Sequence, residues 1–389
     1  MSDESAAMKL YAMAREEKRR FLHDAIEEEC RKMMETCCDF HISDDDYEKI
    51  ILPYWGKYNI KPEKFWFELL GTKDHAVNPA FIPVDLYFND LIPYLNNLEF
   101  GWATSDKCFL DRIFLSVKMP ATVCKCISGL YYDSNMNLIS EERAIKLCLA
   151  FEGEMIVKPS IYSALSRNIS SIDSKTMDEK KMLGVFNKTG ANFIVQGRVN
   201  QHKDLAVFNP ETVNTIRVYS LLMNDEVYIP SVCLRVGAKG ERFIESGNGG
   251  YNCDILDDNR LADTVYRADV IPYIDETGNE TTEHILTPTN DRMGNKYNET
   301  YRIPSMDEIR EKTKELHYLI PHFRFVGWDF TVDENGDPIL FEINTHPDAT
   351  LIQIVTGKPL FGEKTDWILD DFYIQRTLEK NHRQNYFFL

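Results

Sequence analysis

The stretch FVGWDFTVDENGDPILFEINTHPD, residues 325–348, predicts a β-hairpin with acidic residues on both strands. Its central Asn-Gly pair favours a tight turn, because both residue types readily adopt positive φ. If the loop holds an even number of residues centred on that pair, Asp329 lies directly opposite Glu342. Strand alternation then places Asn344 on the same face as Glu342.

Facing carboxylates need a counter-charge. At about 5 Å they repel by roughly 3 kcal/mol at an effective dielectric constant of about 20. Mg²⁺ reverses that repulsion and accepts carboxylate, amide and phosphate oxygens, so we expect Asp329, Glu342 and Asn344 to bind it. Two alternatives stay open: neighbouring Lys or Arg side chains neutralise the pair, or an odd-numbered loop turns one carboxylate to the other face. On that other face we expect an apolar surface of Trp328, Phe330, Val332, Ile339, Phe341 and Ile343.

Composition is that of an ordinary globular protein, with 389 residues, 43% hydrophobic and 27% charged. The formal net charge of −18 argues against nucleic acid or an anionic membrane as a partner. Nine scattered cysteines have neither disulfide-framework nor zinc-site spacing, and no run of about 18 apolar residues predicts a membrane span. We therefore expect reduced thiols and a cytoplasmic protein without membrane insertion.

The order of the elements favours an α+β fold. Residues 4–36 predict one long helix, which would allow a homodimer, and short helices follow to about residue 100. Strands and helices then mix without regular βαβ alternation. Ser140 would cap a helix over 140–151, and a helix over 305–320 would bury Ile309, Leu316, Leu319 and Ile320. The tail, residues 372–389, is expected to be a closing helix.

Basic residues in apolar surroundings suggest an anionic ligand. Lys158 follows a predicted strand between Val157 and Pro159, where it can project into a cleft and hold phosphate oxygens. Arg217 and Arg235 lie within otherwise apolar strands, and buried arginines need anions. That anion is either an internal carboxylate or a polyphosphate bridged by Mg²⁺.

Seven stretches, in this order, resemble the ATP-grasp superfamily: SDKCFLDRIF, PATVCKCISGLYYD, MIVKPS, VNTIRVYSLL, CLRVG, SGNGGYNCDI and the 325–348 hairpin. The resemblance is closest to the sugar-transfer-associated ATP-grasp proteins of bacterial surface-polysaccharide gene clusters. It implies an ATP-grasp fold with a helical N-terminal region (1–100), a smaller subdomain (101–195) and a larger subdomain (196–389) that carries the hairpin and a C-terminal helix.

The resemblance also implies roles for particular residues. ATP would be the nucleotide, with Mg²⁺ on Asp329, Glu342 and Asn344. The remaining assignments are Lys107 and Lys158 to the phosphates; Gln196, Gly197 and Val199 to adenine; His202 or Lys203 to the ribose; Arg217 and Arg235 to the transferring phosphoryl group; and Asn248, Gly249 and Gly250 to the acceptor substrate. Such enzymes phosphorylate a carboxylate and let an amine displace the phosphate, which predicts a carboxylate–amine ligase acting through an acyl phosphate on an unknown substrate pair.

Two departures from the family pattern keep other functions open. The loop after Lys158 contains no glycine, although Ser160, Ser163, Ser166 and Arg167 offer hydrogen-bond donors. The hinge has Gln196 where an acidic residue is common. A kinase on the same fold, a nucleotide-binding scaffold or sensor, and a structural α+β protein without a nucleotide site are therefore the rival hypotheses.

Overall fold

A computed structural model describes residues 2–161, 169–240, 248–274 and 280–375. The chain divides into two compact units, which we describe separately. Unit 1 contains Met1–Asn96, Asp269–Pro288 and Asp348–Leu389, and unit 2 contains Asn97–Ala268 and Thr289–Pro347. The subdomain boundaries expected from the sequence remain a prediction, and most of the expected closing helix lies outside the described residues.

Unit 1 is largely helical. The long N-terminal helix is confirmed as α1, Ser2–Cys37. The other elements are the helices α2 (Asp44–Asp46), α3 (Leu52–Gly56), α4 (Lys64–Leu70), α5 (Val84–Leu86), α6 (Ile92–Leu95), α14 (Thr350–Thr356) and α15 (Thr365–Leu369), the π-helical turns Tyr47–Ile51, Tyr87–Leu91 and Asp370–Gln375, and the 3₁₀ turn Gly362–Lys364.

Buried polar side chains join the two ends of the chain within unit 1. The side chain of Gln353 accepts hydrogen bonds from the backbone N–H groups of Ile82 and Leu360, and donates to the carbonyl of Ile82. The Tyr58 hydroxyl donates to Asp370 across 312 positions of sequence. Because these bonds replace the water that the buried groups lose, they fix the C-terminal helices against the N-terminal ones.

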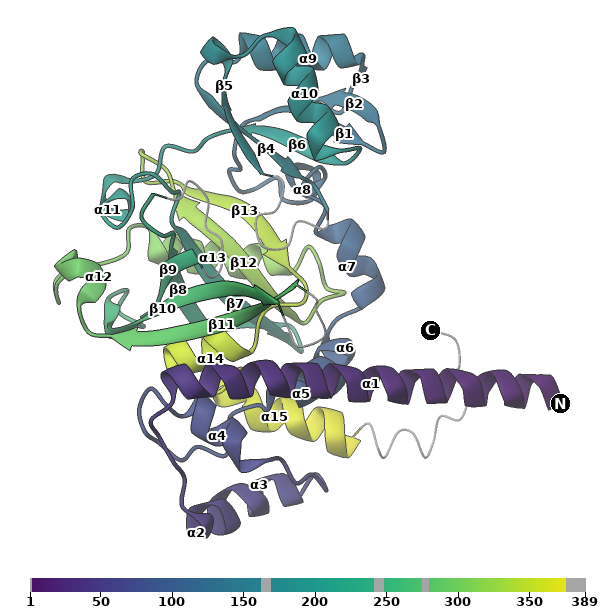
Figure 1. The fold of residues 1–389 in the computed structure, drawn as a ribbon, viewed down its shortest axis with the longest axis vertical. Helices are drawn as coiled ribbons and strands as arrows, with labels where there is room; N and C mark the ends of the chain where they lie inside the picture. Colours follow the sequence, from purple (N-terminus) through teal and green to yellow (C-terminus); the bar gives the residue numbers. More distant parts are fainter. Residues whose placement is uncertain (1, 162–168, 241–247, 275–279, 376–389) are drawn as a thin grey trace. The chain divides into compact units, whose positions relative to one another are not determined.

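Unit 2 contains a six-stranded sheet with the order β3-β2-β1-β6-β4-β5 (Figure 1). Its strands are β1 (Thr122–Ile127), β2 (Leu130–Asp133), β3 (Leu138–Ile139), β4 (Glu154–Pro159), β5 (Ser170–Asp173) and β6 (Phe193–Gly197). Helices α9 (Glu141–Ala150) and α10 (Glu179–Thr189) cover one face and enclose an apolar core. Ser140 caps α9 as predicted, accepting a hydrogen bond from the backbone of Arg143.

The second sheet has seven strands in the order β11-β10-β9-β8-β7-β12-β13. The strands are β7 (Thr215–Met223), β8 (Glu226–Val236), β9 (Asn248–Ile255), β10 (Leu261–Ile274), β11 (Glu280–Thr289), β12 (Phe325–Val332) and β13 (Pro338–Asn344). The remaining helices are α7 (Leu98–Thr104), α8 (Leu110–Ile113), α11 (Lys203–Ala206), α12 (Arg292–Asn295) and α13 (Met306–His317). A 3₁₀ turn covers Ser174–Thr176. Two antiparallel sheets with separate helices confirm the α+β class.

Helix α13 packs on β7, β8 and β12 and closes the main apolar core. Ile309, Leu316 and Ile320 are buried there, as expected. The prediction that Leu319 is buried with them was wrong, because α13 ends at His317 and leaves Leu319 51% exposed.

The β12–β13 hairpin pairs Asp329 with Glu342, as the sequence predicts, but by a different route. Its loop has an odd number of residues, since the last pair before it joins Val332 to Pro338. A β-bulge between Asp329 and Phe330 restores the register.

The bulge also changes the two faces of the hairpin. Phe330 pairs with Leu340, and Leu340 joins the core together with Trp328, Val332 and Ile343. The expectation that Ile339 and Phe341 lie on the core face was therefore wrong. The bulge gives one core position to Leu340 and leaves Phe341 half-buried, outside the core.

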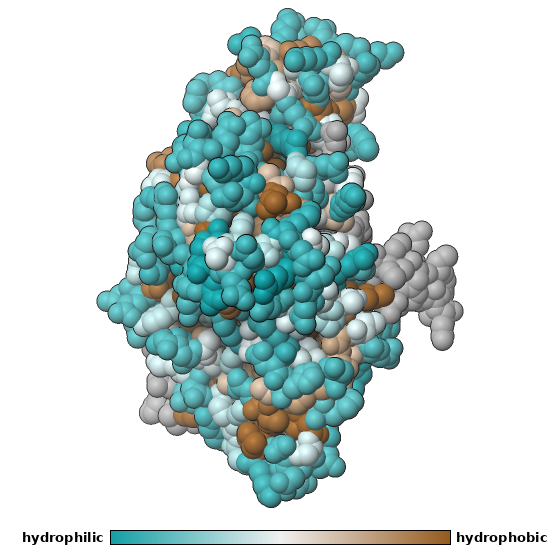
Figure 2. Space-filling view, turned by 90° about the vertical axis from the view of Figure 1, so that its left-hand side faces the viewer, coloured by the Kyte–Doolittle hydropathy of each residue, from teal (hydrophilic) through white to brown (hydrophobic). Residues whose placement is uncertain are grey.

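The surface agrees with the high net charge. The face in Figure 2 is mostly hydrophilic, with hydrophobic residues in separate groups. Across the described residues, no helix is both long and apolar enough to cross a membrane. All nine cysteines are free thiols, and every one except Cys38 is buried.

A hydrogen-bond chain crosses the core beneath the seven-stranded sheet. Trp328 Nε1 donates to Ser220 Oγ at 2.7 Å, and Ser220 Oγ lies 2.7 Å from His317 Nδ1. His317 Nε2 lies 2.8 Å from the carbonyl oxygen of Phe323, so it must donate there. The Nδ1 atom then accepts from Ser220, and the neutral imidazole satisfies both partners.

Folding stability should therefore depend on the protonation of His317. Burial lowers its pKa from 6.5 to about 4. The unfolded chain takes up this proton near pH 6.5 and the folded chain only near pH 4, so stability falls as the pH decreases through that window. Between pH 7 and pH 5 the wild type should lose about 2 kcal/mol more than His317→Gln, whose amide cannot titrate. Urea unfolding at both pH values measures this difference, and equal losses would contradict it.

Candidate functional site

One row of side chains crosses five strands of the seven-stranded sheet. Arg217 on β7 lies opposite Cys233 on β8 and opposite Asp329 on β12. Cys233 in turn faces Asp254 on β9, and Asp329 faces Glu342 on β13. Directly opposed residues share a face, so these five residues form a continuous set that we call the polar row. It lies on the face away from the apolar core.

The centre of the polar row is a buried ion pair. Arg217 Nη2 donates to Asp329 Oδ2 at 2.7 Å, and Arg217 Nε donates to Oδ1, which makes the pair bidentate. Arg235 Nη1 lies 3.8 Å from Asp329 Oδ1, and Asn344 Nδ2 donates to Oδ2 at 3.4 Å. Both arginines thus meet an internal carboxylate, which was one of the two anions considered from the sequence.

The second carboxylate of the hairpin meets lysines. Lys107 Nζ lies 2.9 Å from Glu342 Oε2, from the segment between α7 and α8. Burial would raise the pKa of Glu342, but Lys107, Lys158 and Arg217 outweigh it and lower that pKa to about 2. Glu342 is therefore ionised at any physiological pH, and its side chain keeps 33% of its surface exposed.

Lys158 is the second lysine at this end of the polar row. It lies at the end of β4, is 9% exposed, and its ammonium is 5.6 Å from the ring centroid of Phe341. Burial and the nearby charge of Lys107 lower the pKa of Lys158 to about 8, against the opposing effect of Glu342. The bulged position of Phe341 thus supplies an aromatic neighbour for a lysine in an apolar setting.

A hollow of about 320 Å³ lies beside the end of β6. Gly197, Val199, Phe151 and Ile339 are among its lining residues. A Cβ atom at Gly197 would lie 2.6 Å from Phe151 Cζ, so only glycine leaves room for the tip of the ring against this strand. We call this cavity the Gly197 hollow.

Gln196, also on β6, is 7% exposed, and its buried Oε1 atom has no hydrogen-bond partner among the residues that the structure describes. Its Nε2 donates only weakly, at 3.4 Å, to the carbonyl of Pro120. A buried acceptor without a partner is costly, so this position suits a ligand that donates a hydrogen bond.

The remaining predicted residues occupy other places. His202 caps α11, where its Nδ1 accepts from the backbone of Asp204, and it is not among the residues that line the Gly197 hollow. Gly249 has φ +76°, a conformation that favours glycine, and a Cβ at Gly250 would lie 2.7 Å from the carbonyl oxygen of Val236. The backbone alone therefore explains why glycine occupies both positions. Ser163, Ser166 and Arg167 lie outside the described residues, as does the side chain of Asn248.

Sequence reasoning missed two members of the polar row, Cys233 and Asp254. Both are buried. Burial raises the pKa of the Cys233 thiol to about 12 although Arg235 and Arg217 oppose it. The signal was present, since Cys233 lies two residues before Arg235 on one strand and therefore on the same face. Asp254 could be found only with the register of β8 against β9.

Residues 142–367 match the sequence family described as sugar-transfer associated ATP-grasp. This match spans more than half of the chain. The chain belongs to this ATP-grasp family. The resemblance noted in the sequence is thereby confirmed, and the two sheets are those of an ATP-grasp fold. A search of curated proteins finds no match.

Solved ATP-grasp structures resemble this one weakly. The VanG D-Ala:D-Ser ligase from Enterococcus faecalis aligns over 73% of this chain and 63% of its own, with 13% identity and a TM-score of 0.41. The D-alanyl-alanine synthetase A from Vibrio cholerae aligns over 70% and 66%, with 14% identity and a TM-score of 0.38. The chain therefore spans slightly less than two thirds of the length of these enzymes.

The ATP-grasp family uses ATP and Mg²⁺, and the donor set here suits both. Mg²⁺ commonly takes one or two carboxylates and leaves its other positions to phosphates and water. Glu342, ionised and partly exposed, meets that requirement, and the Asn344 amide lies beside it on the same strand. Asp329 would have to share its oxygens with Arg217. The unpartnered Oε1 of Gln196 is an acceptor of the kind that an adenine amino group requires.

Asp329→Ala should destabilise the fold strongly, because it leaves the buried Arg217 guanidinium without its counter-charge. We expect a loss of about 3–5 kcal/mol in the free energy of unfolding. Arg217→Met together with Asp329→Leu should recover most of this loss, since both charges of the pair are then removed together. Asp337→Ala, at an exposed ion pair of the same hairpin, is the control and should change little. Urea unfolding measures these differences, and equal free energies of unfolding for Asp329→Ala and the wild type would refute the buried Arg217–Asp329 ion pair.

Gly197→Ala should cost about 1–3 kcal/mol of stability, because its methyl group would overlap the Phe151 ring. The matched control is Gly184→Ala on α10, where a Cβ meets nothing within 4 Å. That change should stabilise the protein by about 1 kcal/mol or less, through helix propensity. Thermal unfolding of both variants gives the comparison, and a harmless Gly197→Ala would show that the ring is free to move aside.

Proposed function

We propose that this protein is an ATP- and Mg²⁺-dependent carboxylate–amine ligase. The γ-phosphoryl group of ATP would pass to a substrate carboxylate, and an amine would then displace phosphate from the acyl phosphate. The single observation that carries this proposal is the convergence of four basic side chains on the two hairpin carboxylates, Asp329 and Glu342.

The charge balance of this cluster favours a polyphosphate. Arg217, Arg235, Lys107 and Lys158 supply four positive charges against three carboxylates, Asp329, Glu342 and the neighbouring Asp254 of the polar row, in a protein whose formal net charge is −18. Such a local excess attracts a multiply charged anion and neutralises the charge that develops during phosphoryl transfer. The partly desolvated setting makes each of these interactions stronger than it would be in water.

The chain's own residues would then divide the work. Lys107 and Lys158 would bind the phosphates, and Arg217 and Arg235 would orient the transferring phosphoryl group. Glu342, Asn344 and Asp329 would hold Mg²⁺, which when bound offsets phosphate charge. We further assign Gln196, Gly197 and Val199 to adenine, His202 to the ribose, and Asn248, Gly249 and Gly250 to the acceptor.

The biological setting of the reaction also belongs to the proposal. The family description links the chain to sugar transfer, and we propose in addition a sugar or peptide acceptor in surface-polysaccharide biosynthesis. A cytoplasmic location is supported by nine free thiols. A homodimer through α1 stays a prediction from the sequence.

The test compares the wild type with Glu342→Gln in thermal shift assays with MgATP, MgADP, and ATP plus EDTA. ATP at a hundred times its dissociation constant should stabilise the wild type by about 2.7 kcal/mol. The magnesium-dependent part of the shift should disappear in Glu342→Gln, which lacks the anionic ligand. Glu308→Gln, an exposed position on α13, is the charge-matched control and should behave like the wild type.

The outcome separates the rival functions. Release of ADP that requires both an acid and an amine would establish a ligase. ADP release with a stable phosphorylated product and no amine would indicate a kinase, and binding without turnover would indicate a sensor or scaffold. Absence of any shift with MgATP would overturn the proposal.

A further inference from the structure

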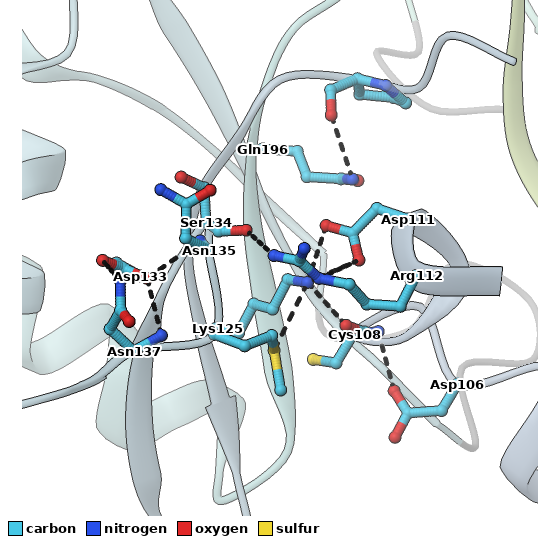
Figure 3. A network of polar contacts seen from close by, with 12 residues as sticks. Asp106, Cys108, Asp111, Arg112, Lys125, Asp133, Ser134, Asn135, Asn137 and Gln196 are labelled. Carbon is cyan, nitrogen blue, oxygen red and sulfur yellow. Dashed lines mark hydrogen bonds and ion pairs between the residues drawn. The ribbon is translucent and has the colours of Figure 1, made fainter. Parts of the chain in front are cut away.

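Lys125 is a lysine that the proposed reaction does not use, and it is completely buried. It lies on β1, and its ammonium contacts both carboxylate oxygens of Asp111 and the carbonyl oxygen of Cys108, each at 2.7 Å (Figure 3). The sulfur of Met136 lies 3.7 Å away. Its three donors therefore have acceptors, although burying an ammonium costs several kcal/mol before pairing.

The partners of Lys125 belong to the segment that carries Lys107. The backbone N–H of Cys108 donates to Asp106 Oδ1 at 2.9 Å, and the backbone N–H of Lys107 donates to the carbonyl of Ser160 at 3.1 Å. The backbone of Lys107 is thus hydrogen-bonded to Ser160, just after β4, and the next residue, Cys108, accepts a hydrogen bond from Lys125. Few degrees of freedom remain for its backbone.

The same segment is held from a third direction. Arg112, next to Asp111 on α8, donates from Nη2 to the carbonyl of Ser134 at 2.6 Å, in the turn between β2 and β3 (Figure 3). The segment is therefore attached to the six-stranded sheet at several points. Lys107, in a segment attached to this sheet, and Lys158, at the end of its strand β4, are 51 positions apart in sequence and present their ammonium groups beside the same carboxylate, Glu342.

A buried ion pair is weak evidence of stability, since apolar residues of similar size often stabilise a fold equally well. Its advantage is directional, because hydrogen bonds fix a backbone more exactly than apolar contacts do. We propose that Lys125 is a positioning residue, which fixes the Asp106–Asp111 segment through Asp111 and the Cys108 carbonyl and so places Lys107 to bind the β- and γ-phosphates of a nucleoside triphosphate. This inference rests on the proposed function.

The test removes the ion pair without leaving a buried charge. The full-length variant Lys125→Met with Asp111→Leu should keep a near-wild-type unfolding midpoint but lose affinity for MgATP by about tenfold or more, because misplaced groups bind poorly. Affinity for AMP, which lacks the distal phosphates, should stay within about twofold of the wild type. Glu142→Gln with Lys146→Gln, an exposed pair on α9, is the control and should change neither affinity. Isothermal titration calorimetry measures the affinity of each of these two variants for MgATP and for AMP, relative to the wild type.

A second comparison separates positioning from a general structural role. In a Lys107→Met background, removal of the Lys125–Asp111 pair should weaken MgATP binding no further, because both changes act through one side chain. A further loss there, or an equal loss for AMP, would overturn the inference. Asp111→Asn keeps an acceptor for Lys125 and serves if the double variant does not fold; it should show the same selective loss, to a smaller extent. Unchanged MgATP affinity in a folded variant would refute the inference alone, whereas a wild type that binds no MgATP would refute the proposed function with it.

Discussion

The bidentate pair between Arg217 and Asp329 is the interaction on which the rest of the site depends. It joins β7 to β12, the strand next to the edge strand β13 of the seven-stranded sheet, and both side chains are almost completely buried. Neither charge could be tolerated there alone. Glu342 and Asn344 flank this pair on the neighbouring strand β13, and Cys233 and Asp254 flank it on β8 and β9. All of them lie on the same face of the sheet, as strand alternation and direct pairing require.

Cations from the other sheet complete this arrangement. Lys158 approaches Glu342 from the six-stranded sheet and Lys107 from the segment attached to it, and the cost of burial is offset differently for each. Lys107 gains a close ion pair, whereas Lys158 has a lowered pKa and an aromatic neighbour. The two hairpin carboxylates are thus neutralised within the protein, by the basic residues that the proposed function assigns to phosphates. The same side chains serve the folded state and the expected ligand.

Much of this could be predicted from the sequence, and the failures have physical causes. The long helix α1 and the cap at Ser140 arise from local rules that hold wherever the chain is placed. The opposition of Asp329 and Glu342 was predicted from an even-numbered loop, but it forms because a bulge compensates for an odd-numbered one. The prediction for Leu319 failed because the end of a helix depends on the packing of the residues beyond its last turn. Asp254 was missed because strand pairing over tens of residues has no local signature, whereas Cys233 could have been found from its position two residues before Arg235 on one strand. The ion pairs of Lys107 and Lys125 depend on tertiary packing, which no spacing in the sequence records.

The β-bulge beside Asp329 has a consequence for how this hairpin can vary among relatives. An odd loop and a bulge cancel each other, so Asp329 faces Glu342 although the turn alone would not align them. An insertion or deletion of one residue in the turn can be absorbed by removing or moving the bulge, without exchanging the faces of Glu342 and Ile343. The tip of the hairpin is therefore free to change in length while the carboxylates keep their places, and alignments anchored on the turn would misplace them by one position.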